Sequence, residues 1–274
     1  MSTTTSARIA FIGGGNMASA IMGGLIANGL PASNITVVEP FDAARAALHT
    51  KFGIAALPTP SEALRTADLV VWAVKPQTFK DAAAAAAPYT TNALHLSVAA
   101  GITTESIGQW LGSHRIVRAM PNTPALVGKG MTGLFARPDV NTEGQALVER
   151  VIGTTGQLIW VDTEEKLDAV TAMSGSGPAY VFLFLEAMTQ AGVDMGLSAD
   201  QSYQLAIATF QGASELAARS EESAAVLRER VTSKGGTTYA AITHMQATGL
   251  PEHFIAALRK AETRAKELAA EFGK

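Results

Sequence analysis

A glycine-rich turn near the N-terminus constrains the fold more than any other feature of this sequence. Arg8 to Ile12 is a short apolar run typical of a β-strand, and Gly13 to Ala18 (GGGNMA) follows it directly and opens a helix. The turn fits G-x-G-x-x-A, in which Gly13 permits a tight turn, Gly15 lets the backbone approach a pyrophosphate and Ala18 allows close helix–strand packing. It predicts a Rossmann-type dinucleotide site. The alternative is a glycine turn needed only for packing.

The residues around this turn indicate how a dinucleotide would be held. Asn16 and Met17 open the helix, whose free N–H groups and partial positive charge favour phosphate oxygens. Glu39 ends the second apolar run, and a carboxylate there accepts hydrogen bonds from the adenosine ribose, which favours NAD. Arg45 offsets that negative charge if its side chain turns inward. The alternatives are an exposed strand-end glutamate and a solvated arginine.

Apolar runs alternate with helix-forming segments through the first half of the chain. Such runs predict a parallel sheet covered by helices on both faces. They lie at 35–38, 69–74, 94–98 and 116–119, with late edge strands at 131–136 and 157–161. Thr59 to Glu62 predicts a helix start capped by Thr59. Beyond residue 163 the pattern is helical. We therefore expect an α/β fold, with a Rossmann-type doubly wound, mainly parallel sheet domain over 1–163 and an all-helical domain over 164–274.

One helix of the second half has an unusual composition. Pro178 to Gly192 is apolar nearly all round, which is typical of a helix buried on every side. The helical domain is too small to cover it fully, so we expect a partner subunit as its second wall. Long helices are also predicted over 199–219 and 252–271.

Composition excludes several classes of protein. A hydrophobic content of 47% with 16% charged residues suits a folded core, and a net charge of −3 lacks the basic surface of a nucleic-acid binder. The absence of cysteine excludes disulfides and thiolate chemistry. No histidine lies at a metal-ligand spacing, and His95, within a predicted strand, is expected in the core. No apolar run is long enough for a signal peptide or a membrane span, so we expect a cytoplasmic protein without metal or membrane.

Two loops are expected at the cofactor crevice. The run 69–74 belongs beside the first strand, which brings four residues to the crevice: Ala73, Val74, Lys75 and Pro76. Lys75 either contacts the cofactor or orients the loop. Asn122 and Thr123 lie between two prolines after another strand and offer amide and hydroxyl groups to the nicotinamide, unless the loop is purely structural.

A second glycine turn lies between two predicted helices of the C-terminal half. Thr232 to Thr238 (TSKGGTT) places two glycines among hydroxyl residues, which makes a backbone concavity rich in donors. Such a concavity suits a small anion such as a substrate carboxylate, and the alternative is an ordinary interhelical turn. Ser174 to Tyr180 (SGSGPAY) is a flexible turn with Pro178 at the first helical position.

Together these motifs resemble the pyrroline-5-carboxylate reductase family over nearly the whole chain. The segments occur in the order expected of that family: Phe11–Ala18 (FIGGGNMA), Val74–Gln77 (VKPQ), Met120–Ala125 (MPNTPA), Gly175–Tyr180 (GSGPAY) and Val231–Thr238 (VTSKGGTT). The first two are shared with other reductases, whereas the last three in combination are specific.

The resemblance implies the last step of proline biosynthesis. In it, NADPH or NADH delivers hydride to the C=N carbon of 1-pyrroline-5-carboxylate and gives L-proline. A protonated cyclic imine already accepts hydride, so the protein has only to hold the ring nitrogen, the carboxylate and the nicotinamide in register. Neither a metal, a cysteine nor a catalytic triad is needed for that chemistry.

The resemblance also implies the substrate residues. Thr238 is the candidate that bonds the ring nitrogen and relays the proton, and Glu221, next to the similar Glu222, matches a position near the amine. The remaining substrate contacts are Ser233, Gly235, Gly236, Thr237 and Pro178. Two positions depart from the family pattern. Lys234 stands where many relatives carry proline, and Glu39 stands where NADPH-dependent relatives carry a small polar residue, which leaves the cofactor preference open.

Assembly through the helical domain is implied as well, as a homodimer with a decamer as the larger form. We expect the substrate loop of one subunit to complete a site with the sheet domain of its partner. A β-hydroxyacid-dehydrogenase-like reductase is one rival, but it needs a catalytic lysine on a helix of the second domain, where only Lys166 comes near. A dinucleotide sensor without catalysis is the other, and it has no need of the TSKGGTT loop.

Overall fold

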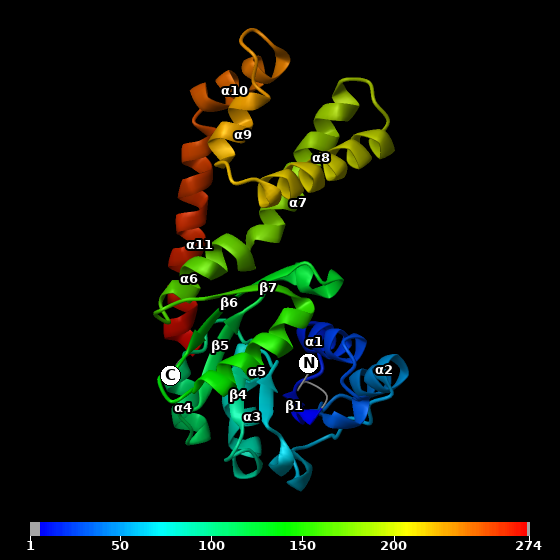
Figure 1. Ribbon diagram of the computed structural model, residues 1–274, viewed down its shortest axis with the longest axis vertical. Coiled ribbons are helices and arrows are strands. Elements are labelled where there is room, and N and C mark those ends of the chain that lie inside the picture. Colours follow the sequence, from blue (N-terminus) through cyan, green and yellow to red (C-terminus); the bar gives the residue numbers. More distant parts are fainter. Residues whose placement is uncertain (1–5, 273–274) are drawn as a thin grey trace. The chain divides into compact units, whose positions relative to one another are not determined.

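A single seven-stranded sheet organises the first part of the computed structural model, which describes residues 6–272 (Figure 1). Its strands are β1 (Ile9–Ile12), β2 (Ile35–Val38), β3 (Leu69–Trp72), β4 (Leu94–Ser97), β5 (Ile116–Met120), β6 (Gly130–Ala136) and β7 (Gly156–Trp160). They lie in the order β2-β1-β3-β4-β5-β6-β7, and all neighbours pair in parallel except β5 and β6. The predicted doubly wound, mainly parallel sheet is confirmed.

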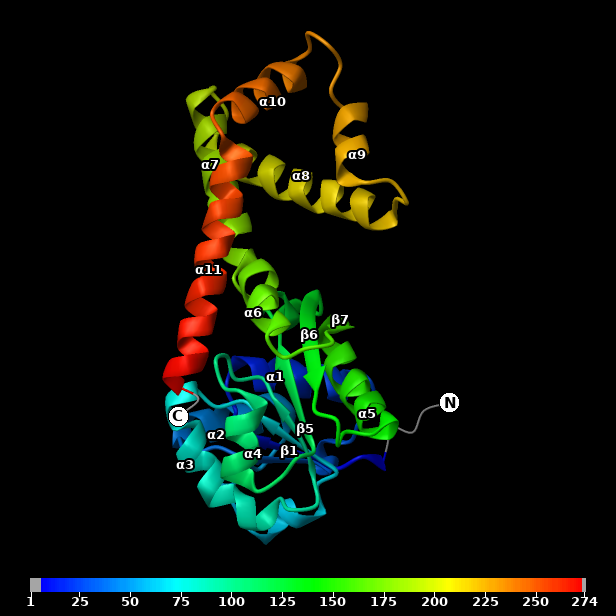
Figure 2. The same cartoon turned by 90° about the vertical axis from the view of Figure 1, so that its left-hand side faces the viewer.

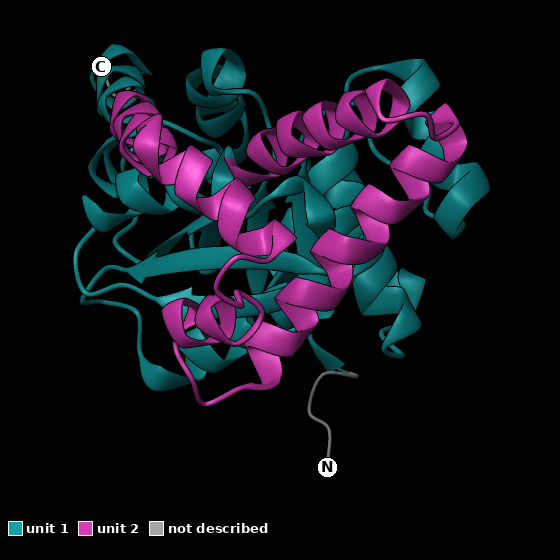
Figure 3. Ribbon diagram, turned by 90° about the horizontal axis from the view of Figure 1, so that it is seen from above, with its two compact units in different colours: residues 1–176, 261–274 teal, residues 177–260 magenta. Residues whose placement is uncertain are grey.

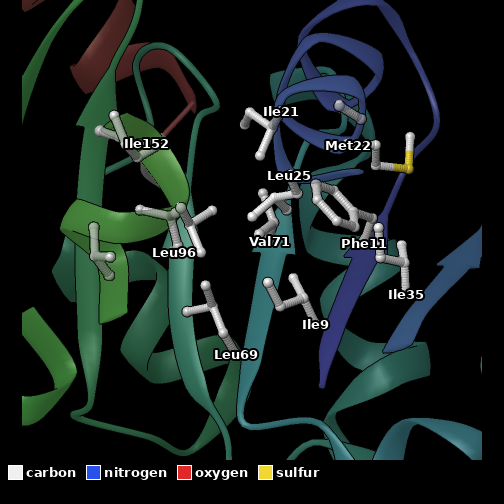
Figure 4. Packing of buried hydrophobic residues seen from close by; sticks show 14 of the residues in the cluster. Ile9, Phe11, Ile21, Met22, Leu25, Ile35, Leu69, Val71, Leu96 and Ile152 are labelled. Atoms are coloured by element: carbon white, nitrogen blue, oxygen red, sulfur yellow. The ribbon is translucent and has the colours of Figure 1, made fainter. Parts of the chain in front are cut away.

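Helices cover both faces of this sheet, because alternate residues of its buried strands point in opposite directions. The helices are α1 (Asn16–Ala27), α2 (Asp42–Phe52), α3 (Pro76–Ala86), α4 (Thr104–Leu111), α5 (Thr142–Ile152) and the short α6 (Lys166–Val170). Ile9 and Phe11 pack on the side of α1 and α5, and Figure 4 shows Phe11 next to Met22 and Leu25 of α1. Ala10 and Ile12 pack on the side of α3 and α4. Figure 2 shows α5 on one side of the sheet and α3 and α4 on the other.

The segment between α2 and β3 shows one feature that was not predicted and corrects one prediction. The segment after α2 forms no third strand of the usual Rossmann order among the described residues. It pairs with β2 only through a bridge between Val38 and Leu57, with the N–H of Glu39 donating to the carbonyl of Leu57 at 2.9 Å. The predicted helix start at Thr59 is wrong, because a short 3-10 helix spans Glu62–Thr66 and Ser61 precedes it without a side-chain cap.

The chain divides into two units, which Figure 3 colours separately: residues 1–176 with 261–274, and residues 177–260. Unit 1 contains the sheet and the last turns of α11 (Leu250–Phe272). Unit 2 contains α7 (Gly177–Asp194), α8 (Ala199–Arg219), α9 (Ala224–Arg230), α10 (Thr237–Ala247) and the first part of α11. The domain boundary predicted after residue 163 stays a prediction beside this division.

Unit 2 leaves much of its apolar surface uncovered within one chain. Phe184 packs against Phe210 and Phe254 with ring centroids 6.4 and 5.8 Å apart, which holds α7, α8 and the start of α11 together. By contrast, Phe182 and Leu183 of α7 are 58% and 63% exposed. The helix predicted to be buried on every side is therefore open in the single chain, as expected of a helix whose second wall is another subunit. No helix within residues 6–272 combines the length and hydropathy needed to cross a membrane.

Candidate functional site

The glycine turn after β1 joins the carboxyl ends of three strands. Gly13 has a φ of +94°, and its N–H donates to the carbonyl of Val38 at 2.8 Å. A Cβ added at Gly13 would lie 2.6 Å from the carbonyl oxygen of Ala73, at the end of β3. Both the left-handed conformation and the close approach require glycine at this position. The turn thus places the start of α1 at the edge of the sheet where doubly wound folds bind ligands.

The start of α1 suits an anion. A Cβ at Gly15 would meet no atom within 4 Å, so the backbone there faces open space. Gly15 and Asn16 are exposed and Met17 is half-buried. No side chain caps α1, so its leading N–H groups and its positive end of the dipole remain available to phosphate oxygens. These residues fit the pyrophosphate of a dinucleotide.

Glu39 holds the other side of this turn from the end of β2. It is only 6% exposed, and its Oε2 accepts from the N–H of Gly14 at 2.8 Å while its Oε1 accepts from the N–H of Phe41 at 3.0 Å. Arg45 donates to the backbone carbonyls of Glu39 and Pro40 at 2.9 and 2.8 Å and pairs with Asp42. The guanidinium of Arg45 therefore bonds the loop backbone and Asp42, while the Glu39 carboxylate lies beside the glycines.

The loop after β3 lies against the same turn. Ala73 donates its N–H to the carbonyl of Ile12 at 2.8 Å, and a side-chain carbon of Val74 would be 3.2 Å from a Cβ on Gly13. Lys75 precedes α3 and is exposed, while Pro76 begins that helix. The carbonyl of Lys75 accepts from the N–H and hydroxyl of Thr78 at 3.0 and 3.1 Å. The structure thus places Ala73 and Val74 against the glycine turn. Cofactor contacts of Lys75 and Pro76 stay predictions.

Asn122 lies at the same edge, two residues beyond β5, but its side chain is already engaged. Its Nδ2 donates to the carbonyl and the hydroxyl of Ser174 at 3.3 and 3.1 Å, and its Oδ1 accepts from the N–H of Met131 at 2.9 Å. Thr123 is exposed and begins a 3-10 helix over Thr123–Val127, which packs against α1. The predicted contacts of Asn122 and Thr123 with the nicotinamide stay predictions.

Two sets of contacts near this edge were not predicted from the sequence. The first is the pair of bonds between Asn122 and Ser174, because the sequence around Ser174 indicates only a flexible turn. The second is a buried ion pair in which Arg118 donates to Glu164 at 3.0 Å. The Glu164 carboxylate also accepts from the N–H and hydroxyl of Thr104 at 2.8 and 2.5 Å, so it caps α4. The sequence feature that could have indicated this ion pair is Arg118, a charged residue inside the otherwise apolar run of β5.

The second glycine turn lies in unit 2, between α9 and α10. Gly235 has a φ of +78°, and Gly236 precedes α10 in an extended conformation, with its N–H donating to the carbonyl of Ser233 at 3.0 Å. A Cβ on Gly236 would lie 2.7 Å from the Ser233 hydroxyl. No side chain caps α10, so the N–H groups of Thr237 and Thr238 at its start receive no capping hydrogen bond from a side chain. The uncapped N–H groups at this turn suit a carboxylate.

The two adjacent glutamates before α9 differ in their contacts. Glu222 forms an ion pair with Arg230. Glu221 is exposed and makes no hydrogen bond or ion pair to any residue in the described part of the chain. Of the two, Glu221 is therefore the one that is free to meet a ligand. Pro178 is the second residue of α7 and is half-buried.

Other titratable groups have structural surroundings. His95 is 1% exposed and accepts from the indole N–H of Trp72 at 3.2 Å, and burial, with a smaller effect of Arg115, lowers its pKa to about 4. The prediction of a core histidine is confirmed. Lys166, which a β-hydroxyacid-dehydrogenase-like mechanism would need, is exposed and paired with Asp162 at 2.6 Å. Within residues 6–272 no group of three or more histidine and carboxylate side chains is placed to hold a metal ion.

Comparison with known proteins matches separate family models to the sheet-forming part and the helical part of the chain. The family model described as pyrroline-5-carboxylate reductase dimerisation matches residues 164–268, and the model described as NADP oxidoreductase, coenzyme F420-dependent, matches residues 8–101. The pyrroline-5-carboxylate reductase of Pseudomonas aeruginosa is 44% identical over 97% of this chain and 98% of its own length. That of Glycine max is 37% identical over 95% of both chains.

Solved structures give the same result. A pyrroline-5-carboxylate reductase from Coxiella burnetii superposes with a TM-score of 0.91 at 40% identity, covering 96% of this chain and 99% of the other. The Plasmodium falciparum pyrroline carboxylate reductase, solved with NADP bound, superposes with a TM-score of 0.86 at 28% identity, covering 97% and 99%. The chain belongs to the pyrroline-5-carboxylate reductase family.

Proposed function

We propose that this protein reduces 1-pyrroline-5-carboxylate to L-proline with hydride from a reduced nicotinamide dinucleotide, the last step of proline biosynthesis. The observation that carries the proposal is the uncapped donor turn before α10, which bears the TSKGGTT motif in a chain of this family. The glycine turn after β1 supports the cofactor side of the reaction. We place the enzyme in the cytoplasm.

The chemistry requires little from the protein beyond orientation. A bound reduced nicotinamide supplies the hydride. The hydride adds to the carbon of the substrate's C=N bond, the π electron pair moves to the nitrogen, and the nitrogen, protonated beforehand, becomes the secondary amine of proline. Because the iminium is already electrophilic, catalysis rests on holding the ring and its carboxylate in one place.

The turn before α10 is suited to that task. The N–H groups at the start of α10 and the Ser233 hydroxyl hold the substrate carboxylate, favoured by the positive end of the helix dipole. Gly235 shapes the turn through its left-handed backbone conformation, and Gly236 through its close approach to the Ser233 hydroxyl. The Thr238 hydroxyl bonds the ring nitrogen and keeps the proton there, and Glu221 favours the positive charge of the iminium. Pro178 contributes an apolar contact to the ring.

We further propose that NADH is the preferred cofactor. The Glu39 carboxylate can accept from the ribose hydroxyls of NADH with its remaining lone pairs, whereas it repels the 2′-phosphate of NADPH. Arg45 does not compensate, because its guanidinium is engaged by two backbone carbonyls and by Asp42. Asn16, Met17 and the loop from Ala73 to Pro76 complete the cofactor contacts.

Assembly follows from the dimerisation domain and the exposed apolar residues of α7. We propose a homodimer through unit 2, with a decamer as the larger form. Sedimentation velocity across a hundredfold range of concentration measures this directly. A single monomer boundary with full turnover at every concentration would contradict the dimer.

Replacing Thr238 by alanine tests the proposed substrate role. The change should lower kcat/KM for the imine by about 10²-fold, since one bond made to the reacting nitrogen is lost. The affinity for NADH, followed by its fluorescence, should stay within about twofold, because the cofactor turn is untouched. Thr243→Ala is the matched control, as Thr243 is exposed on the same helix and leaves the loop intact. Unchanged turnover in Thr238→Ala would remove this residue from the mechanism.

A further inference from the structure

A small polar network binds the turn over Thr171–Gly175 to the edge of the sheet. This turn lies near the end of the first segment of unit 1, residues 1–176. The side chain of Asn122 connects two elements: its Nδ2 donates twice to Ser174, and its Oδ1 accepts from Met131 on β6. The Ser174 hydroxyl adds a long bond of 3.4 Å to the carbonyl of Met131. Three segments distant in sequence are thereby joined at the carboxyl end of β5. The amide of Asn122 has both N–H groups committed to this network.

The segment that receives these bonds is a π-helical turn over Thr171–Gly175, between α6 and α7. The N–H of Ser176 donates to the carbonyl of Thr171 at 2.8 Å, which closes the wide five-residue hydrogen-bonded ring. Such turns cost backbone energy and occur frequently at functional sites. The bonds from Asn122 supply part of what keeps this turn in place.

Close packing adds to the polar contacts. A Cβ on Gly175 would lie 2.5 Å from the terminal methyl of Met120, the last residue of β5. A Cβ on Gly133 of β6 would lie 2.8 Å from a methyl of Val170. Gly175 lets the turn pack closely on the last residue of β5, and Gly133 lets the short helix α6 pack closely on the middle of β6. Of the two contacts, the one at Gly133 is the less forgiving, because Val170 has a short branched side chain whereas the Met120 methyl ends a flexible one.

From these contacts we infer that Asn122 and Ser174 are a positioning pair for hydride transfer, and that the Asn122 side chain is not itself a nicotinamide ligand. The inference rests on the proposed function. Ser174 lies near the end of the first segment of unit 1, immediately before Gly177 and Pro178 begin α7. The pair holds the backbone from which the chain enters the unit that carries the substrate turn. Hydride transfer depends steeply on the distance between donor and acceptor, so a relaxed turn should slow the chemical step.

The test compares Asn122→Ala, which removes three hydrogen bonds, with Ser174→Ala, which removes only those of the hydroxyl. Met173→Ala is the matched control, because this side chain is 69% exposed in the same turn. Ser174→Thr keeps the hydroxyl and serves as the rescue. For each variant we would measure kcat, KM for the imine, the dissociation constant of NADH, the melting temperature and the primary isotope effect with 4-deuterated NADH.

We expect kcat of Asn122→Ala to fall about 10- to 100-fold, and that of Ser174→Ala to fall less. The isotope effect on kcat should rise as hydride transfer becomes rate-limiting, while the NADH dissociation constant stays within about threefold. Ser174→Thr should recover most of the rate. A purely structural role would lower the melting temperature and the active fraction without raising the isotope effect.

Three results would overturn the inference. One is a kcat of Asn122→Ala within twofold of wild type in folded protein, and another is an equal loss in Met173→Ala. The third is a weakened NADH affinity that accounts for the whole loss, which would make Asn122 a cofactor ligand. In all three the wild type is active, so only the positioning role fails. A wild type that binds NADH but never reduces the imine would overturn this inference together with the proposed function.

Discussion

Glu39 offers the sharpest prediction, because one carboxylate accounts for the proposed cofactor preference. The substitution Glu39→Gln removes the charge while keeping the size of the side chain. In the structure the carboxylate is buried beside the glycine turn, and the guanidinium of Arg45 bonds backbone carbonyls and Asp42 rather than this carboxylate. The variant therefore isolates the electrostatic effect on a 2′-phosphate placed at the adenosine ribose.

The size of that effect follows from Coulomb's law. Two unit charges about 5 Å apart interact by about 3 kcal/mol at an effective dielectric constant of about 20. Solvent at the mouth of the site reduces this value, so we expect a change of 10- to 100-fold in relative affinity, at about 1.4 kcal/mol for each factor of ten. A glutamine cannot accept from both Gly14 and Phe41 with two oxygens as the carboxylate does, which should cost about 1 kcal/mol of stability.

The assay is the ratio of kcat/KM for NADH to that for NADPH at a fixed imine concentration. Wild type should favour NADH, and Glu39→Gln should lower the ratio at least tenfold, chiefly through improved use of NADPH. Asp42→Asn is the control, because it makes the same change of charge three residues further on, at the start of α2, on a side chain that is 93% exposed. A wild type that prefers NADPH, or an equal shift in Asp42→Asn, would refute the reasoning.

Three further predictions concern stability. Gly13→Ala should lower the free energy of unfolding in urea by at least about 2 kcal/mol, because the residue has a φ of +94° and its Cβ would meet the Ala73 carbonyl at 2.6 Å; an unchanged midpoint would contradict this. Glu164→Ala should cost about 3 kcal/mol by the same measurement, since it leaves the guanidinium of Arg118 buried without its carboxylate. The pKa of His95 is lowered to about 4 in the folded protein, so the unfolded chain takes up the proton first and stability falls as the pH drops from 6.5 towards 4, by up to about 3 kcal/mol. His95→Gln should flatten that pH dependence, and an unaltered slope would exclude His95 as its source.

The sheet was predictable because most of its strands are continuous apolar runs in the sequence. Buried parallel strands need continuous apolar runs, and the turn after β1 needs glycine at Gly13 for conformational reasons that no other residue meets. The long helices were equally predictable. Helix α8 spans Ala199–Arg219 as predicted, and a capping box at Ser198 fixes its start. In these elements local chemistry and tertiary position agree.

The remaining features depend on contacts that no local pattern encodes. The π-helical turn at Thr171–Gly175 contacts Met120 and Asn122, some fifty residues earlier in the chain, and no local pattern predicts those contacts. The absent third strand reflects a segment that makes one bridge at Leu57 and then turns away. For the candidate site, the identity of Glu39 suggested a ribose contact, but only the structure shows that Arg45 is engaged elsewhere.

The central claim is most directly tested by following the oxidation of NADH and NADPH at the nicotinamide absorbance with 1-pyrroline-5-carboxylate as the acceptor, while L-proline is quantified in the same samples. We predict one proline formed for each reduced nicotinamide consumed, with NADH the faster donor. Protein that is folded, self-associated and able to bind NADH, yet consumes neither cofactor in the presence of the imine, would contradict the account.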